Sequence, residues 1–183
     1  PVSGELMSQY KPTSKPGVVL VGSHVNKTTQ QLERLLEEES AIGIEVDVVK
    51  LRDDRNTYQE ILDRAVAEVF SACEAGKTPV IYTSRQELSF ADIQQRLEFG
   101  VTVSALLMDS FLISKGGITS NDVLSKGLAL RTARLLGQIL PGCSLVCTSP
   151  DHSQFPNLPV VLFPGNVGNA EALATVYSRL LNN

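Results

Sequence analysis

Short apolar runs alternate with longer amphipathic stretches along the first half of the chain. Runs of roughly four to eight residues rich in β-branched side chains predict buried strands. Between the first two runs, Leu32, Leu35 and Leu36 recur at helical spacing in NKTTQQLERLLEEES, which predicts a helix. The predicted strands are Gly17–Ser23, Ile44–Leu51 and Thr78–Ser84.

A second predicted helix, over about Thr57–Glu74, separates the last two of these strands. Asp53, Asp54 and Asn56 offer caps for its start, and Gly76 ends it. Its apolar side is predicted to consist of Ile61, Leu62, Ala65, Val69 and Phe70.

The second half mixes helical and strand patterns. A polar helix is predicted around Phe90–Glu98, and VTVSALLMDSFLIS (residues 101–114) is apolar enough for an interior helix despite its β-branched residues. LALRTARLLGQIL (residues 128–140) fits strand and helix, and we favour the strand. LPVVLF (Leu158–Phe163) predicts a strand, PGNVGN a turn, and AEALATVYSRLLN a closing helix.

This order of elements predicts an α/β fold. The β-α-β-α-β start builds a parallel sheet with helices on its faces. We therefore expect a three-layer arrangement with helices on both faces, in which the C-terminal strands complete a mixed sheet. Residues 17–183 are expected to form one domain, because 183 residues are too few for two comfortable ones.

Composition narrows the classes of function. Hydrophobic residues make up 43% of the chain, enough for a substantial core, and the net charge is −4. No run of Lys and Arg forms a stripe, so we expect no nucleic-acid or membrane partner. No apolar run approaches the roughly 20 residues that span a bilayer. The three cysteines agree with a reducing compartment, and we expect a cytoplasmic protein.

The first 16 residues are polar and rich in Pro and Ser, as in a linker. We therefore expect a leader or linker at residues 1–16, and the chain to be the C-terminal half of a longer protein. Elsewhere, Cys143 and Cys147 are interpreted as small buried hydrophobes rather than a metal pair, because no second Cys/His cluster exists. His24 and His152 form no motif, and no metal site is predicted.

Three glycine-containing loops stand at strand ends or open helices. They are GSHVNKTT (Gly22–Thr29), KGGITSND (Lys115–Asp122) and FPGNVGN (Phe163–Asn169). Glycine lets the backbone approach a ligand closely, and the first amides of a helix carry partial positive charge. Open α/β sheets bind ligands beyond the carboxyl ends of their strands. Together these features favour a phosphate group, and Lys27, Lys115 and Lys126 could add charge.

A structural interpretation of each loop remains open. Ser23 and Thr28 could simply cap the helix that follows, and Thr119 with Asp122 resembles a shortened capping box. Glycines in the third loop could only allow a turn. The strong phosphate motifs, G-x-x-x-x-G-K-[ST] and G-x-G-x-x-G, are missing from the sequence.

The order and spacing of these loops resemble the C-terminal, nucleotide-binding domain of the four-carbon acid sugar kinases, a family once known only as a domain of unknown function. VLVGSHVNKTTQQLERL, GGITSNDVLSKGL, GQILPGCSL and VVLFPGNVGN carry the resemblance. It implies a protein of carbohydrate metabolism in which an N-terminal half binds a threonate, erythronate or oxo-tetronate. The C-terminal half would bind ATP, which phosphorylates a hydroxyl of the sugar acid.

Carried over by position, the resemblance implies a nucleotide site on all three loops. The sugar pocket and the catalytic residues would lie outside this chain, so the domain would be inactive alone. We leave Mg²⁺ as a cofactor and a homodimer as the assembly open. The implied nucleotide-site residues are Ser23, Gly116, Gly117, Ile118, Thr119, Ser120, Gly165, Asn166 and Gly168.

Two positions depart from the family pattern. Ile118 stands where many members have an acidic residue, and Phe163-Pro164 stands where many have Lys-Ser. Losing the carboxylate removes one way to hold Mg²⁺, and losing the lysine removes a phosphate contact. Two alternatives to a working kinase half therefore stay open. One is a ligand-binding or regulatory module without turnover, and the other is a structural domain whose glycine loops are only turns.

Overall fold

The computed structural model describes residues 2–3, 9, 15–47, 55–84 and 110–181. A single seven-stranded sheet runs through the molecule in the order β2-β3-β1-β4-β7-β6-β5. The first five strands of that order are mutually parallel, and β6 and β5 are antiparallel to their neighbours. The strands are β1 (Val18–Val21), β2 (Ala41–Val46), β3 (Thr78–Thr83), β4 (Leu112–Lys115), β5 (Arg134–Leu140), β6 (Cys143–Cys147) and β7 (Pro159–Phe163).

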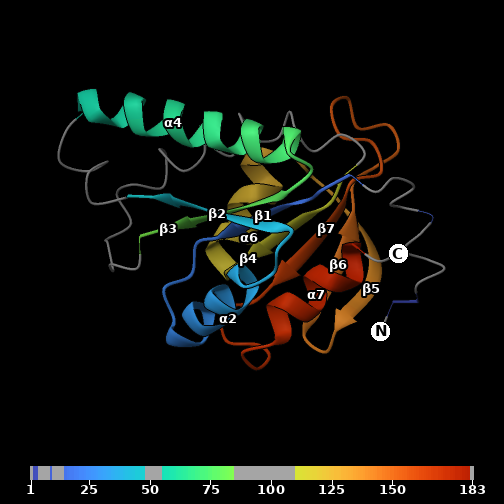
Figure 1. Ribbon diagram of the computed structural model, residues 1–183. Helices are drawn as coiled ribbons and strands as arrows, with labels where there is room; N and C mark the ends of the chain where they lie inside the picture. Colours follow the sequence, from blue (N-terminus) through green and yellow to red (C-terminus); the bar gives the residue numbers. More distant parts are fainter. Residues whose placement is uncertain (1, 4–8, 10–14, 48–54, 85–109, 182–183) are drawn as a thin grey trace.

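Helices cover both faces of the sheet, which confirms the predicted three-layer α/β fold (Figure 1). On one face, α4 (Arg55–Glu74) packs over β2 and β3. On the other, α2 (Asn26–Leu36) and α7 (Ala172–Leu181) pack against each other and against the sheet. A short helix, α6 (Gly117–Asp122), continues into a π-helical turn, η2 (Val123–Gly127).

Central strands are buried on both faces, because neighbouring residues of a strand point to opposite sides. Val18 joins the core under α4, whereas Val19 and Val21 join the core under α2 and α7. This double burial explains why β1 and β7 appear in the sequence as continuous β-branched runs rather than as alternating patterns.

The middle of the chain corrects one prediction. Residues 101–114 were expected to form an interior helix, yet Leu112–Lys115 is strand β4, which pairs in parallel with β1 and β7. Residues 112–114 are fully apolar or small and include β-branched Ile113, which suits a strand buried on both faces. The rest of that prediction, residues 101–109, and the predicted helix Phe90–Glu98 lie outside the described residues.

Smaller differences concern the bounds of predicted strands and the apolar side of helix α4. The strand predicted at Ile44–Leu51 begins at Ala41 instead, and residues 48–51 lie outside the described part. Of residues 128–140, only Arg134–Leu140 forms a strand. Phe70 was placed on the apolar side of α4, but it is 42% exposed while Ala72 is buried. The proposed caps Asp53 and Asp54 lie outside the described residues. Gly76, at φ +69°, follows α4 as expected.

Within the described residues, no helix combines the length and apolar character needed to cross a membrane.

Candidate functional site

The three glycine loops leave the carboxyl ends of three neighbouring strands. We call Gly22–Thr29 the first loop, Lys115–Asp122 the second and Phe163–Asn169 the third. They follow β1, β4 and β7, which are adjacent and parallel, so the loops meet at one edge of the sheet. In the sheet β1 lies between β3 and β4, and the chain fills the β2–β3 side first and the β4–β7 side afterwards. In open α/β sheets such a reversal of strand order is where ligands bind, beyond the carboxyl ends of the strands.

The first and second loops touch through Gly22. Its amide donates to the carbonyl oxygen of Lys115 over 3.1 Å. A Cβ placed on Gly22 would lie 2.1 Å from Thr119 Oγ1, far inside van der Waals contact. Position 22 therefore accepts only glycine while Thr119 keeps this place.

The third loop closes against both of the others. The Thr28 hydroxyl, which is buried, lies 3.1 Å from the carbonyl oxygen of Gly165 and 3.2 Å from Ser23 Oγ. A Cβ on Gly165 would lie 2.9 Å from Ser23 Oγ. The amide of Gly116 donates to the carbonyl oxygen of Phe163 over 2.8 Å. Each loop is thus in direct contact with the other two.

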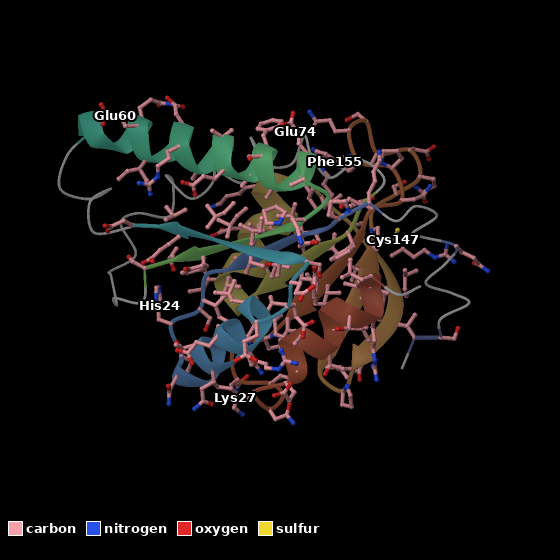
Figure 2. The ribbon with its side chains drawn as sticks, viewed as in Figure 1. His24, Lys27, Glu60, Glu74, Cys147 and Phe155 are labelled. Carbon is pink, nitrogen blue, oxygen red and sulfur yellow. The ribbon has the colours of Figure 1, made fainter. Side chains whose placement is uncertain are left out.

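Side chains from α2 and β4 hold the carbonyl oxygens of the third loop. Lys115 Nζ donates to the carbonyls of residues 164 and 165, at 2.7 and 3.1 Å. Lys27 Nζ donates to that of residue 166 at 3.2 Å. Gln31 Nε2 donates to those of residues 167 and 169, at 3.0 and 2.7 Å. Figure 2 marks His24 and Lys27 near the start of α2, where this set of donors begins.

These contacts fix the direction of the loop's amides. In a trans peptide the N–H points opposite to the C=O of the same unit, and the described chain has no cis bond. The N–H groups of Gly165, Asn166 and Gly168 therefore point away from Lys115 and α2. Within the described residues, no acceptor is recorded for any of these three amides. These three donors are left available, whereas the Val167 amide of the same loop donates to the carbonyl of Pro164 over 3.5 Å.

Lys115 supplies a buried positive charge beneath this loop. Its side chain is completely buried, and Nζ lies 4.2 Å from the centroid of the Phe163 ring. Burial lowers the pKa of Lys115 from 10.5 to about 8; nearby Cys143 acts to raise it and Lys27 to lower it further. The ammonium and the free loop amides together favour an anionic ligand.

The structure brings most of the predicted site residues together. Ser23, Gly116, Thr119 and Gly165 form the contacts between loops. Gly117 and Ile118 are exposed at the start of α6, where first-turn amides have no partner within the helix. Asn166 and Gly168 lie on the exposed side of the third loop. Ser120 differs from the rest, because its hydroxyl turns inward to Ser114, 3.1 Å from the carbonyl oxygen.

Simple helix capping does not explain the polar residues of these loops. The residue that caps α2 is Val25 and the one that caps α6 is Gly116, and neither provides a side-chain cap. Asp122 instead pairs with Lys126 over 3.2 Å, which neutralises the lysine expected to add charge. The capping interpretations of Ser23, Thr28 and Thr119 are therefore wrong.

Sequence reasoning missed Gln31, which is fully buried and holds two carbonyls of the third loop. The available clue was its position. Gln31 lies one helical turn after Thr28, so both side chains share the face of α2 that meets the loop. Position 31 looked like ordinary helix surface because glutamine is common there.

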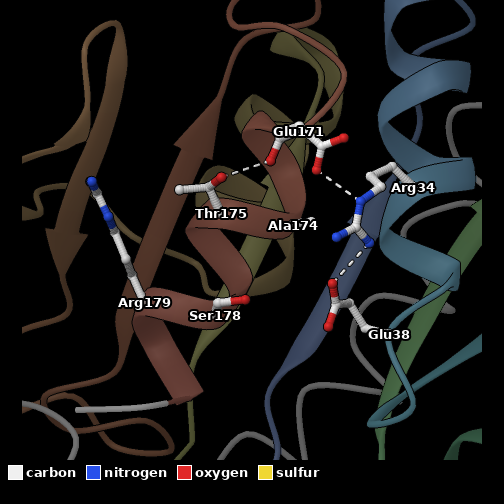
Figure 3. A pocket seen from close by; sticks show the side chains of 7 residues that line it. All are labelled: Arg34, Glu38, Glu171, Ala174, Thr175, Ser178 and Arg179. Carbon is white, nitrogen blue, oxygen red and sulfur yellow. Dashed lines mark hydrogen bonds and ion pairs between the residues drawn. The ribbon is translucent and has the colours of Figure 1, made fainter.

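A pocket lies between α2 and α7, with a volume of about 420 Å³ (Figure 3). Its charged side chains already have partners. Arg34 contacts Glu38 at 2.9 Å and Glu171 at 2.8 Å, and Arg179 donates to the carbonyl of Ile139. This pocket offers a ligand fewer open donors than the glycine loops do.

The remaining candidate groups have structural roles. Cys143 and Cys147 are buried, and burial raises the pKa of each thiol to about 11. His152 Nδ1 accepts from the amide of Phe155 at 3.0 Å, and its Nε2 lies 2.8 Å from the carbonyl of Leu128. In the described part of the chain, no three His, Cys, Asp or Glu side chains gather as a metal site. Arg85, which follows β3, lies outside the described residues.

Comparison with known proteins places the chain in a family. The family model described as the nucleotide-binding C-terminal domain matches residues 18–173. A search of the curated proteins found none that matches this chain.

Solved structures share the fold. A domain of unknown function (DUF1537) from Bordetella bronchiseptica, crystallised with citrate as a domain-swapped dimer, is 20% identical, with a TM-score of 0.73 over 97% of this chain and 44% of that one. A putative tRNA synthase from Salmonella typhimurium LT2 is 23% identical, with a TM-score of 0.64 over 96% of this chain and 42% of that one. This chain therefore spans less than half the length of either structure.

Proposed function

The chain belongs to the nucleotide-binding C-terminal domain family, as its resemblance to the four-carbon acid sugar kinases implied, and we propose that its three glycine loops bind the phosphates of ATP. The observation that carries this proposal is the third loop. Its carbonyls are held by Lys115, Lys27 and Gln31, so its amides are presented to a ligand. Backbone amides beside positive charge form the kind of concavity that binds phosphate.

The reaction we propose is phosphoryl transfer from ATP to a hydroxyl of a four-carbon acid sugar. Catalysis of such transfers rests mainly on positioning and on stabilising charge, so a domain that holds the phosphates is half of the machinery. We assign the sugar acid to a further domain, because this chain spans under half of its structural relatives. The citrate in the Bordetella structure is likewise a carboxylic acid, which supports an acidic substrate.

We assign no Mg²⁺ ligand to this chain. Asp122 is the acidic residue of the second loop, and it is paired with Lys126. Ile118, which is exposed in the same loop, offers no oxygen to a cation. The described residues are therefore given no metal-binding role in the proposed reaction.

A second candidate function is favoured by the same residue. Ile118 is 48% exposed at the site, where the family pattern often has an acid. An apolar side chain there suits a module that binds a nucleotide without turning it over. Binding that is independent of Mg²⁺ would support this regulatory role over the kinase role.

Calorimetric titration with ATP, ADP and a non-hydrolysable analogue, each with and without Mg²⁺, tests both candidates. Gly117→Val is the informative variant, since a Cβ at position 117 meets no atom within 4 Å and the fold should tolerate it. We expect ATP affinity to fall by about tenfold or more, which corresponds to about 1.4 kcal/mol.

Gly127→Val is the matched control. Its Cβ would also have space, with the nearest atom at 3.9 Å, but it lies outside the three loops. Its affinity for ATP should match that of the unmodified chain. Absence of heat with every nucleotide would refute the proposed function, and full affinity in Gly117→Val would refute the position of the site.

A further inference from the structure

Lys115 is a buried cation without an acidic partner. It ends β4, is completely buried, and stands in register with Phe163 of β7. Its ammonium donates to the carbonyls of residues 164 and 165, which are dipoles rather than charges. In the described part of the chain, no carboxylate forms an ion pair with it, and none influences its pKa.

The titratable groups that face Lys115 do not compensate its charge. Cys143 on β6 is a neutral thiol near pH 7, because burial raises its pKa to about 11. Lys27 on α2 adds a second positive charge. A buried charge is normally paired, since leaving water without a partner is costly. Such an unpaired cation beneath the glycine loops is a candidate for a functional group.

We propose that Lys115 is a positioning residue for the nucleotide, one that holds the third loop open to phosphate and whose missing counter-charge is the bound polyphosphate. This inference rests on the proposed function. Lys115 does not touch the ligand, because its side chain has no exposed surface. It acts through its hydrogen bonds to the carbonyls of residues 164 and 165. It also acts through the electrostatic attraction between its charge and the phosphates on the other side of the loop backbone.

The charge of Lys115 predicts that ATP binding depends on pH. The Lys115 pKa is about 8 without ligand, and an anion nearby favours the charged form and raises that pKa. Binding is therefore strongest below pH 8 and weakens as the pH rises above it, by up to roughly tenfold per unit. When ATP binds in that range, the complex takes up a proton, which goes to the Lys115 amine. The phosphates contribute nothing there, since a phosphate group loses its last proton near pH 6, about two units lower.

The experiment is calorimetric titration of the chain with ATP from pH 7 to pH 9.5, in two buffers of different ionisation enthalpy. We expect affinity to fall on the order of tenfold across that range, with proton uptake above pH 8. Lys115→Met keeps the length of the side chain and removes its charge. It should bind ATP about tenfold more weakly at pH 7.5, with a flat pH profile and no proton uptake.

Two further variants separate positioning from general structure. Lys115→Arg stays charged at every pH of the experiment, so it should restore much of the affinity while the profile stays flat. Lys77→Met is the matched control. Lys77 also donates to a backbone carbonyl, that of Glu39 at 2.7 Å, but it precedes β3 at the opposite end of the strands. It should keep both the affinity and the pH dependence of the unmodified chain.

The outcomes distinguish the role of Lys115 from nucleotide binding itself. A flat profile in the unmodified chain, or an unchanged slope in Lys115→Met, overturns the role of Lys115 and leaves nucleotide binding intact. Failure of the unmodified chain to bind ATP at any pH overturns the proposed function, and the role of Lys115 with it.

Discussion

Lys115 and Phe163 stand opposite each other on adjacent parallel strands, and the Lys115 ammonium lies 4.2 Å from the centroid of the Phe163 ring. Many members of the resembling family have a lysine at the position of Phe163. In this chain the neighbouring strand places a positive charge next to the side chain at that position.

Removing the buried ammonium should change stability in a pH-dependent way. The folded-state pKa of Lys115 is lowered, so the unfolded chain binds more protons between about pH 8 and 10.5, and stability rises with pH there. The free-energy cost of burying the charged ammonium is fully present below pH 8. Lys115→Met lacks this proton equilibrium. Its unfolding free energy relative to that of the unmodified chain should therefore fall by about 2 kcal/mol from pH 7.5 to pH 10. Urea unfolding at both pH values measures it, and a constant difference would contradict it.

Gly22→Ala should destabilise the contact between the first two loops. The new Cβ would meet Thr119 Oγ1 at 2.1 Å, and overpacking of this kind costs about 1–3 kcal/mol. Thr119→Ala removes the clashing hydroxyl. The double variant should recover about 1 kcal/mol relative to the sum of the single variants, as measured by urea unfolding. Additive effects would mean that the two residues are not in contact.

Thr28→Val tests the anchor between α2 and the third loop. Valine has the shape of threonine but no hydroxyl, so the Gly165 carbonyl loses one of its two donors. We expect a loss of about 1–2 kcal/mol in unfolding free energy, together with weaker ATP binding. Thr175→Val is the control, since that hydroxyl of α7 donates to the carbonyl of Glu171, the residue just before the helix. Equal effects of the two substitutions on ATP affinity would argue against an anchoring role for Thr28.

The pocket between α2 and α7 should be dispensable for nucleotide binding. Arg34→Met breaks its pairs with Glu38 and Glu171 and leaves the three loops untouched. We expect unchanged ATP affinity and little change in the melting temperature, because both ion pairs remain partly open to solvent. A large loss of affinity in this variant would place the nucleotide in that pocket instead.

Local patterns predicted two of the three central strands, β1 and β7, but not β4, which lies between them. β1 and β7 could be predicted because both are continuous runs rich in β-branched residues that are followed by glycine-containing loops. β4 could not be, since four strand residues followed a longer apolar stretch that also fits a helix. Its identity depends on pairing with β1 and β7, which no local window contains.

The candidate site shows the same division. The glycines of all three loops could be found from residue types, because few residues other than glycine allow close backbone approach. The supporting side chains could not be found in this way. Gln31 holds carbonyls 136 and 138 positions away in the sequence, and Lys115 reaches across 49 positions to the carbonyl of Pro164. Such contacts follow from strand order, which becomes known only with the fold.

The central position of β1, β4 and β7 also determines when this site can form. These neighbours in the sheet begin at residues 18, 112 and 159, so their pairing joins the earliest and latest parts of the domain. During synthesis on the ribosome, the first loop cannot contact the third until nearly the whole domain has been translated. Ligand binding should therefore appear only as folding is completed, and a nascent chain that stops before β7 should lack it.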